Sequence, residues 1–246
     1  MDDALFVGAH WSPAGWVAAV FSAEGFEGAS VHDEIGQLWG AVEERARRLL
    51  VDVPVGLVEE GDPERAADRL ARAVLGDRAG AVTTPPVREA TRKRRYPAAE
   101  RVMRRKADAD LSKAAFAASA AIAAVDDLLR EVPETREVVG ESHPELCFRA
   151  FAGEPLAEDR RTAGGYAERM RTLAEFDRDA PPTVQSAAED AAGTDARVED
   201  VLDALALGYT ARPGPGDLRT LPADPDTDAT GLPMRLHYRA DAPLSK

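Results

Sequence analysis

Two apolar runs that each end in a carboxylate constrain the fold of this 246-residue chain more than any other feature. Val51 leads directly into Asp52, and Val139 is followed two residues later by Glu141. Short apolar runs of this kind predict buried strands. In open α/β sheets, ligands bind outside the carboxyl ends of the parallel strands. A fold that places the two runs side by side therefore brings these acids to one edge of the sheet.

The order of the predicted elements favours one α/β domain. Strands are predicted at residues 5–9, 16–21 and 29–32, a helix at 35–49, and further strands at 50–53 and 138–141. Helices are predicted at 63–75, 111–129, 145–151, 166–176 and 198–210. The apolar spacing changes between strand and helix periodicity from one segment to the next. This β-β-β-α-β-α-β order predicts a mixed β-sheet flanked by helices over residues 1–212.

The C-terminal segment differs in composition from the rest of the chain. Residues 213–246 contain six prolines and many acids. Proline interrupts both helices and sheet ladders, so this composition predicts mostly loop. One edge strand is predicted within the segment, at residues 234–238.

The charge of the chain is strongly acidic. It carries 44 acidic and 31 basic residues, for a net charge of −13, and only four of the basic residues are lysine. This balance is typical of a halophilic protein that stays soluble in a salty cytoplasm. No apolar stretch approaches the ~20 residues of a membrane helix, and Met1-Asp2-Asp3 does not begin a secretory signal. Cys147 is the single cysteine, so an intramolecular disulfide is excluded. We therefore expect a cytoplasmic protein without a membrane partner.

One window of the sequence is basic against this background. Residues 88–106 hold nine basic residues and two acids. Clustered basic residues are typical of contacts with a nucleic-acid backbone, and Tyr96 offers a ring on which a base could stack. The alternative is a mobile loop whose arginines pair with the acidic body. The candidate nucleic-acid-binding residues are Arg88, Arg92, Lys93, Arg94, Arg95, Arg104 and Arg105.

Three groups of polar residues are candidates for a chemical site. Glu141, His143 and Glu145 form the densest group of carboxylates and imidazole, a combination that suits Mg or Mn. Asp52 is either a ligand at a strand end or the cap of a turn before proline. Asp200 and Asp203 are three residues apart on the helix predicted at 198–210, so they share a face. This face either points along the sheet edge or lies at the surface. His143 could instead cap the helix that follows it.

Several short motifs recur in an order that resembles a known family. The matching segments are Gly15-Trp16, Asp52 to Leu57, Arg65 with Asp68 and Ala71-Arg72, Leu75-Gly76 with Arg78, Glu141 to Phe148, and Asp200 to Ala204. They are similar to the motifs of domain-of-unknown-function family 429, described as predicted RNase H-like nucleases. The resemblance covers roughly residues 5 to 210, and it implies an RNase H-like fold. One position departs from the family pattern, because His10 stands where the first strand should end in aspartate.

The resemblance also implies a metal-dependent site for phosphodiester hydrolysis with Mg or Mn. The implied catalytic residues are Asp52, Glu141, His143, Glu145, Asp203 and His10, and the implied metal ligands are Asp52, Glu141, Glu145, Asp200 and Asp203. Two divalent ions need several carboxylates to balance their charge. His10 removes one of these, which favours a single-metal scheme with His10 or His143 as general base.

Three hypotheses of function follow from these observations. The first is a metal-dependent nuclease, with residues 88–106 on the nucleic-acid backbone. The second is a non-catalytic RNase H-like protein that binds nucleic acid and lost its activity with the change at His10. The third is a nucleotide-handling enzyme similar to actin and the sugar kinases. The first turn, Trp11 to Gly15, holds a single glycine and leaves little room for a phosphate loop, which disfavours the third.

Overall fold

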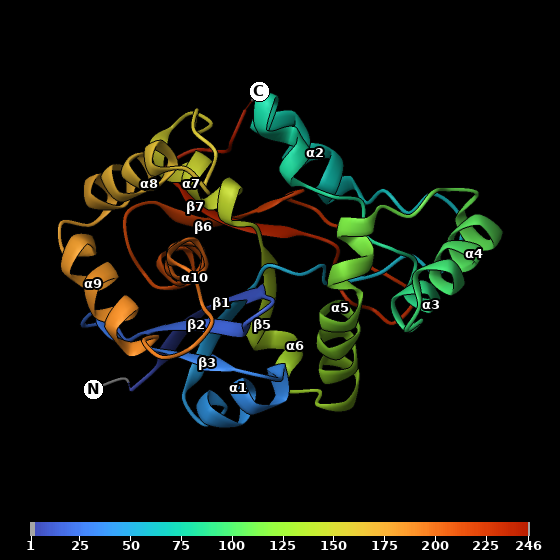
Figure 1. The fold of residues 1–246 in the computed structure, drawn as a ribbon, viewed down its shortest axis with the longest axis horizontal. Helices are drawn as coiled ribbons and strands as arrows, with labels where there is room; N and C mark the ends of the chain where they lie inside the picture. Colours follow the sequence, from blue (N-terminus) through green and yellow to red (C-terminus); the bar gives the residue numbers. More distant parts are fainter. Residues whose placement is uncertain (1–2, 246) are drawn as a thin grey trace.

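The computed structural model describes residues 3–245. Residues 1, 2 and 246 lie outside the described residues. They include the start of the segment considered as a secretory signal and the last residue of the C-terminal segment. A seven-stranded sheet runs through the molecule in the order β3-β2-β1-β4-β5-β7-β6 (Figure 1). The prediction of an α/β fold with a mixed sheet flanked by helices is confirmed. Within the described part of the chain, no helix combines the length and apolar character needed to cross a bilayer.

The sheet contains both antiparallel and parallel pairs. Its strands are β1 (Leu5–Ser12), β2 (Gly15–Phe21), β3 (Phe26–His32), β4 (Ala46–Val51), β5 (Val139–Ser142), β6 (Asp217–Leu221) and β7 (Leu236–Ala240). The first three strands form an antiparallel meander. β4 pairs parallel to β1, β5 parallel to β4, and β7 parallel to β5. β6 closes the far edge by antiparallel pairing with β7. Three parallel strand ends, those of β1, β4 and β5, therefore lie side by side.

Helices cover both faces of the sheet. They are α1 (Ile35–Val42), α2 (Ala66–Leu75), α3 (Arg88–Thr91), α4 (Tyr96–Ala107), α5 (Lys113–Glu131), α6 (Thr135–Val138), α7 (Pro144–Ala152), α8 (Ala163–Phe176), α9 (Ala180–Asp190) and α10 (Val198–Ala211), with a 3-10 turn at Gly76–Ala81. Because strand side chains alternate, Leu49 and Val51 join the core under α1 and α5, while Leu50 joins the core under α7 to α10. The sheet is thus buried on both sides.

The helix predicted at residues 35–49 corresponds to α1, but its predicted C-terminal end is wrong. The helix stops at Val42, and the residues predicted to continue it, including Ala46 and Leu49, belong to β4. Apolar residues three apart fit a helix turn, but here Leu49 pairs with Val7 on one side and Val139 on the other. Pairing on both edges of β4 outweighs the local periodicity. The strand therefore begins four residues before the predicted start.

The C-terminal segment belongs to the same sheet. It supplies β6, which the sequence does not predict, and β7, which corresponds to the edge strand predicted at 234–238. β7 lies between β5 and β6, so it is an internal strand and the edge assignment is wrong. Its side chains Leu236 and Tyr238 are buried with Leu146 of α7. Residues 213–245 therefore complete the α/β domain.

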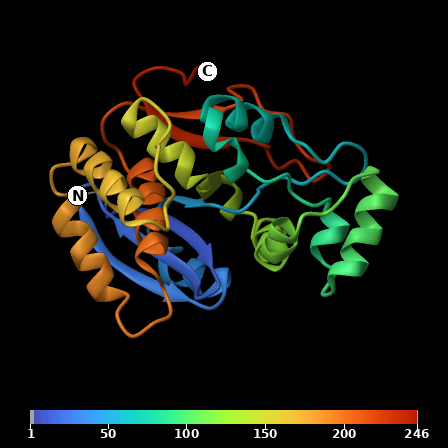
Figure 2. The same cartoon turned by 45° about the horizontal axis from the view of Figure 1, so that its top comes forward.

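The basic window is helical. α3 and α4 carry most of it, and together with the start of α5 they bury a small apolar cluster that includes Val87, Val102 and Met103. In both views these two helices lie at one end of the molecule, opposite α9 (Figures 1 and 2). α9 itself replaces a stretch for which the sequence predicts no element. The loop in the alternative for residues 88–106 is therefore wrong, whereas its ion pairs with acidic residues are present.

α10 packs on the sheet at unusually short range. A Cβ atom added to Gly8 of β1 would lie 2.1 Å from the backbone nitrogen of Gly208 and 2.3 Å from the carbonyl oxygen of Ala204. The main chain of β1 therefore contacts the main chain of α10 directly, an approach that requires glycine at position 8. The helix is buried from Asp200 to Ala211. This contact fixes the first turn of α10 beside the carboxyl end of β1.

Candidate functional site

The parallel strands bring the predicted site residues to one edge. Ala9 of β1 pairs with Val51 of β4, and Val51 pairs with Glu141 of β5. The next residues along β1 and β4 are His10 and Asp52. α10 adds two carboxylates from its first turns. We call His10, Asp52, Asp200 and Asp203 the Asp52 cluster.

His10 lies at the centre of the Asp52 cluster. Its Nδ1 is hydrogen-bonded to Asp52 Oδ2, and its Nε2 lies 3.4 Å from Asp200 Oδ1. The other oxygen of Asp52 accepts a hydrogen bond of 2.8 Å from the backbone N–H of Trp11. The His10 side chain is 6% exposed. Both ring nitrogens therefore face carboxylates in a largely dry setting.

The carboxylates decide the charge of His10. Burial by itself lowers the pKa of His10, but Asp52, Asp200 and Asp203 together raise this pKa to about 10. The imidazole is consequently protonated at neutral pH, and both nitrogens donate. The departure from the family motif thus places a cation, instead of a carboxylate, at the end of β1.

The two carboxylates of α10 are held in different ways. Asp200 Oδ2 accepts a 2.9 Å hydrogen bond from the backbone N–H of Arg197, so this side chain caps the helix while its second oxygen faces His10. Asp203 forms an ion pair with Arg160, which comes from the loop before α8. Burial raises the pKa of Asp203, although His10 and Arg160 oppose the shift. The predicted shared face of Asp200 and Asp203 is confirmed, and it is buried.

Glu141 is bound by a buried arginine. Arg65 donates 2.7 Å hydrogen bonds from Nη1 and Nη2 to the two carboxylate oxygens of Glu141, and further bonds of 2.6 and 3.0 Å to Asp68. Val55 N–H donates a third bond to Glu141. Burial lowers the pKa of Arg65, but the two carboxylates raise it overall, so the guanidinium stays charged. Glu141 therefore fixes the start of α2 against β5.

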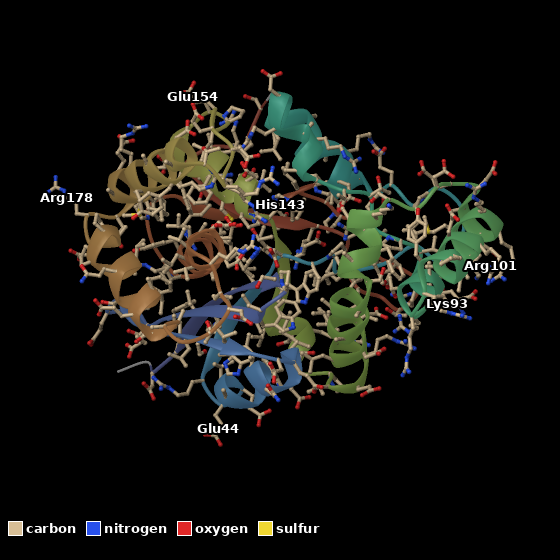
Figure 3. All side chains as sticks on the ribbon, in the orientation of Figure 1. Glu44, Lys93, Arg101, His143, Glu154 and Arg178 are labelled. Atoms are coloured by element: carbon tan, nitrogen blue, oxygen red, sulfur yellow. The ribbon has the colours of Figure 1, made fainter. Side chains whose placement is uncertain are left out.

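His143 and Glu145 lie at the start of α7. His143 Nδ1 accepts a 3.2 Å hydrogen bond from the backbone N–H of Glu145, and its Nε2 lies 3.3 Å from the carbonyl oxygen of Ala81. His143 Nδ1 thus caps the start of α7, as the capping alternative predicts, and Nε2 contacts a backbone oxygen. Glu145 forms an ion pair with Arg169, whose side chain is fully buried. Figure 3 shows His143 near the middle of the molecule.

Two cavities meet beside the Asp52 cluster. The acidic cavity, about 280 Å³, is lined by His10, Asp52, Ala81, His143, Pro144, Glu145, Arg160 and Asp203. The apolar cavity, about 150 Å³, is lined mainly by apolar side chains that include Trp11, Pro85, Ala118 and Ile122. Asp52, Ala81 and His143 line both cavities. The two cavities are therefore neighbours, and we refer to the pair as the cleft.

A family model described as "Protein of unknown function (DUF429)" matches residues 10–227. The chain belongs to this family. The comparison with curated proteins and the comparison with solved structures each gave no match. The match begins at His10 and includes every member of the Asp52 cluster, so the arrangement described above is that of a DUF429 protein.

Each site carboxylate of this DUF429 chain already faces a cation of the chain itself. Asp52 and Asp200 face His10, Asp203 pairs with Arg160, and Glu141 and Glu145 bind Arg65 and Arg169. Among residues 3–245, no three His, Cys, Asp or Glu side chains are arranged to hold a metal ion. A divalent ion requires free carboxylate oxygens at its surface. In this arrangement, the residues present do not fit the predicted Mg or Mn ion.

The basic window contributes less free charge than its composition suggests. Arg88 is buried and forms ion pairs with Glu59, Asp126 and Asp228, so its assignment as a nucleic-acid contact is wrong. Four others pair with neighbouring acids: Arg92, Lys93, Arg104 and Arg105. Arg94 and Arg95 are exposed and have no carboxylate within ion-pair distance among the described residues. Lys93 and Arg101 lie at the outer end of the molecule, away from His143 (Figure 3).

The arginines that pair with the site carboxylates were not predicted as site residues: Arg65, Arg160 and Arg169. Arg160 lies in a loop whose sequence carries no pattern that links it to α10. Arg169 follows a helical pattern and is buried where an arginine is expected to be exposed. Arg65 is part of the matched family motif, and Asp68 three residues later forms a side-chain bond to the Arg65 N–H, the capping arrangement of a helix start. That spacing is the one signal from which a structural role for Arg65 could be inferred.

Proposed function

We propose that this DUF429 protein is an RNase H-like protein that binds nucleic acid in the cleft at the Asp52 cluster and does not hydrolyse it with two metal ions. One observation carries the proposal: the protonated ring of His10 lies between Asp52 and Asp200, where cation charge is needed. His10 and Arg160 then offset two of the three carboxylates of the cluster without an added ion. The second sequence hypothesis, a non-catalytic relative, is the one that this geometry favours.

The arrangement of strands supports the RNase H-like part of the proposal. An antiparallel meander of β1, β2 and β3 is followed by β4 and β5, both parallel to the β1 direction, in the spatial order β3-β2-β1-β4-β5. Acidic residues at the ends of β4 and on a late helix meet the end of β1. This is the placement that the sequence resemblance implies for an RNase H-like site.

Electrostatics supports the loss of two-metal chemistry. A two-metal site holds its ions through a group of carboxylates that remain negative until the ions bind. Here one cation faces Asp52 and Asp200, and a second pairs with Asp203. Aspartate at position 10 would change the local charge by two units, which is the charge of one divalent ion. The identity of residue 10 therefore decides whether the cluster demands a metal.

The cleft supports a nucleic-acid ligand. Trp11 is half-buried and lines the apolar cavity, so its ring is placed to contact a planar group. A cavity on the order of 150 Å³ accommodates a flat six-membered ring. Arg160 lines the acidic cavity with its side chain 39% exposed, and its guanidinium suits a phosphate oxygen. Base and phosphate contacts thus lie on the two sides of Asp52.

A metal-dependent nuclease that uses Mg or Mn is the second candidate. The observation that favours it is the convergence itself, because Asp52, Asp200 and Asp203 come from distant parts of the chain and meet at one strand edge. Carboxylates gathered in this way are otherwise costly to bury. Under this alternative, His10 and Arg160 would have to leave their carboxylates for the ion to enter.

Cleavage and binding assays separate the two candidates. Labelled single-stranded RNA and DNA would be incubated with Mg or Mn and with four proteins: the parent, His10→Asp, Asp52→Asn and the surface control Asp159→Asn. The proposal predicts binding without cleavage by the parent and a gain of Mn-dependent cleavage by His10→Asp. Cleavage by the parent that Asp52→Asn abolishes and Asp159→Asn leaves intact would establish the nuclease. Absence of binding by the parent would refute both.

A further inference from the structure

A third cavity lies at the amino-terminal ends of β1 and β4, whereas the Asp52 cluster lies at their carboxyl ends. It has a volume of about 530 Å³ and is lined by Arg47 and Arg48 of β4 and by Arg239 of β7. Arg48 comes four residues before Asp52 along the strand, which separates the two positions by roughly 13 Å. Phe6 and Leu218 supply part of its apolar wall. We call this space the arginine cavity.

The three arginines of this cavity lack carboxylate partners. Among residues 3–245, no carboxylate lies within 4.0 Å of the guanidinium groups of Arg47, Arg48 or Arg239. Around the Asp52 cluster, by contrast, Arg65, Arg160 and Arg169 each bind an acid. In a chain with a net charge of −13, three arginines in one cavity without an ion-paired carboxylate among residues 3–245 are an exception that needs a physical reason. Burial lowers the pKa of Arg239, and Asp217 opposes this shift from beyond ion-pair distance.

Burial makes the missing partners of Arg239 and of the half-buried Arg48 more significant, whereas Arg47 is exposed at the rim of the cavity. Arg239 is only 7% exposed, and it donates hydrogen bonds of 3.1 and 2.8 Å to the carbonyl oxygens of Thr210 and Gly216. Burial lowers the pKa of Arg48, and the nearby Arg47 and Arg235 lower it further. Buried charges in folded proteins are normally paired, because an unpaired one loses its hydration without compensation.

Helix capping explains one of the three arginines and not the others. Thr210 lies in the last turn of α10, so Arg239 meets carbonyl groups at the negative end of the helix dipole. Arg48 reaches a single backbone oxygen, that of Glu137, at the long distance of 3.5 Å. Glu137 also lines the cavity, but its carboxylate is not within ion-pair distance of Arg47 or Arg48. Among residues 3–245, these two guanidinium groups have no ion-paired carboxylate.

We propose that the arginine cavity binds a ligand that carries two or more phosphate groups. A guanidinium presents paired N–H donors that match phosphate oxygens, and several of them share the charge of a polyphosphate. The volume lies within the range typical of small-molecule sites, roughly 300–1,000 Å³, and exceeds what one inorganic phosphate fills. The ligand is either a free polyphosphate compound or a stretch of nucleic-acid backbone. The site is independent of the function proposed for the Asp52 cluster.

Calorimetric titration with tripolyphosphate tests this site. The proteins would be the parent, the double variant Arg47→Gln/Arg48→Gln and the control Arg101→Gln, which removes an exposed arginine of α4, a helix that does not line the cavity (Figure 3). Arg239 stays unchanged, so that α10 keeps its cap. Loss of two charged contacts predicts an affinity at least about tenfold lower in the double variant. The control should bind tripolyphosphate as the parent does.

Three outcomes would overturn the proposal: no binding by the parent, equal binding by the parent and the double variant, or an equal loss in Arg101→Gln. Circular dichroism of the double variant would show whether it keeps its fold. A competition arm assigns the source of the phosphates. Displacement of tripolyphosphate by a short single-stranded oligonucleotide points to a nucleic-acid backbone, and failure to displace it points to a free polyphosphate.

Discussion

The charge of His10 can be measured through the pH dependence of folding. The unfolded chain is expected to bind a proton at His10 with the ordinary pKa of 6.5, whereas the surrounding carboxylates raise the pKa to about 10 in the folded protein. A raised folded pKa gives stability that is complete below about pH 6.5 and is lost as the pH rises towards 10. His10→Gln removes the charge and keeps a hydrogen-bond donor, so the variant should lack this loss.

The expected magnitude follows from the shift in pKa. Between the two pKa values, the folded protein holds one more proton than the unfolded chain, so the free energy of unfolding falls by about 1.4 kcal/mol per pH unit. From about pH 6.5 to about pH 9, this amounts to roughly 3 kcal/mol in the parent and none in His10→Gln. The range ends where the thiol of Cys147 would begin to ionise in the unfolded chain.

Urea unfolding at several pH values and constant ionic strength provides the measurement. His32→Gln is the matched control. Burial lowers the pKa of His32, so the effect of this histidine on the free energy of unfolding is confined to pH values below about 6.5. The control should therefore follow the parent across the alkaline range. Parallel curves for the parent and His10→Gln would mean that the folded protein holds His10 neutral. The charge balance that supports the proposed function would then be wrong.

Three further predictions concern the frame around the site, and each is checked by chemical denaturation. Arg65→Met leaves two buried carboxylates without their partner and should lower the stability by about 3–5 kcal/mol; a change below 1 kcal/mol would contradict the buried ion-pair network. Gly8→Ala forces β1 from Gly208 and should destabilise the protein by about 2 kcal/mol or more, whereas Gly40→Ala, in open space within α1, should stabilise it by roughly 0.5–1 kcal/mol. Ser112→Ala removes the cap on the Ala115 N–H and should cost about 1 kcal/mol, with an unchanged midpoint refuting the cap.

The convergence of acids could be predicted from the sequence because it follows from topology. A strand that ends in Asp52, a second that ends near Glu141, and the rule that parallel strand ends share an edge suffice to place them together. The paired acids of α10 could be predicted from their three-residue spacing. In each case a local pattern determines the position of the side chain.

The partners of those acids could not be predicted, because they depend on contacts between distant segments. Arg160 reaches Asp203 across 43 positions in the chain, and Arg65 reaches Glu141 across 76. No local pattern distinguishes Arg160 from an arginine at the surface, and the spacing of Arg65 and Asp68 indicates a helix start without indicating the contact with Glu141. The same limit applies to Arg88, whose basic neighbours suggest an exposed phosphate contact although it is buried among carboxylates. An arginine-rich window therefore says little about which guanidinium groups are free.

The bare backbone contact between β1 and α10 separates the frame of the site from its chemistry. Since no side chain stands between Gly8 and Gly208, the distance from strand to helix is set by main-chain atoms alone. Residue 10 follows this contact on β1 by two positions. A substitution there should therefore replace one side chain of the Asp52 cluster without moving Asp52, Asp200 or Asp203. A substitution at position 10 therefore changes the charge at the end of β1 while the main-chain contact between the strand and α10 stays in place.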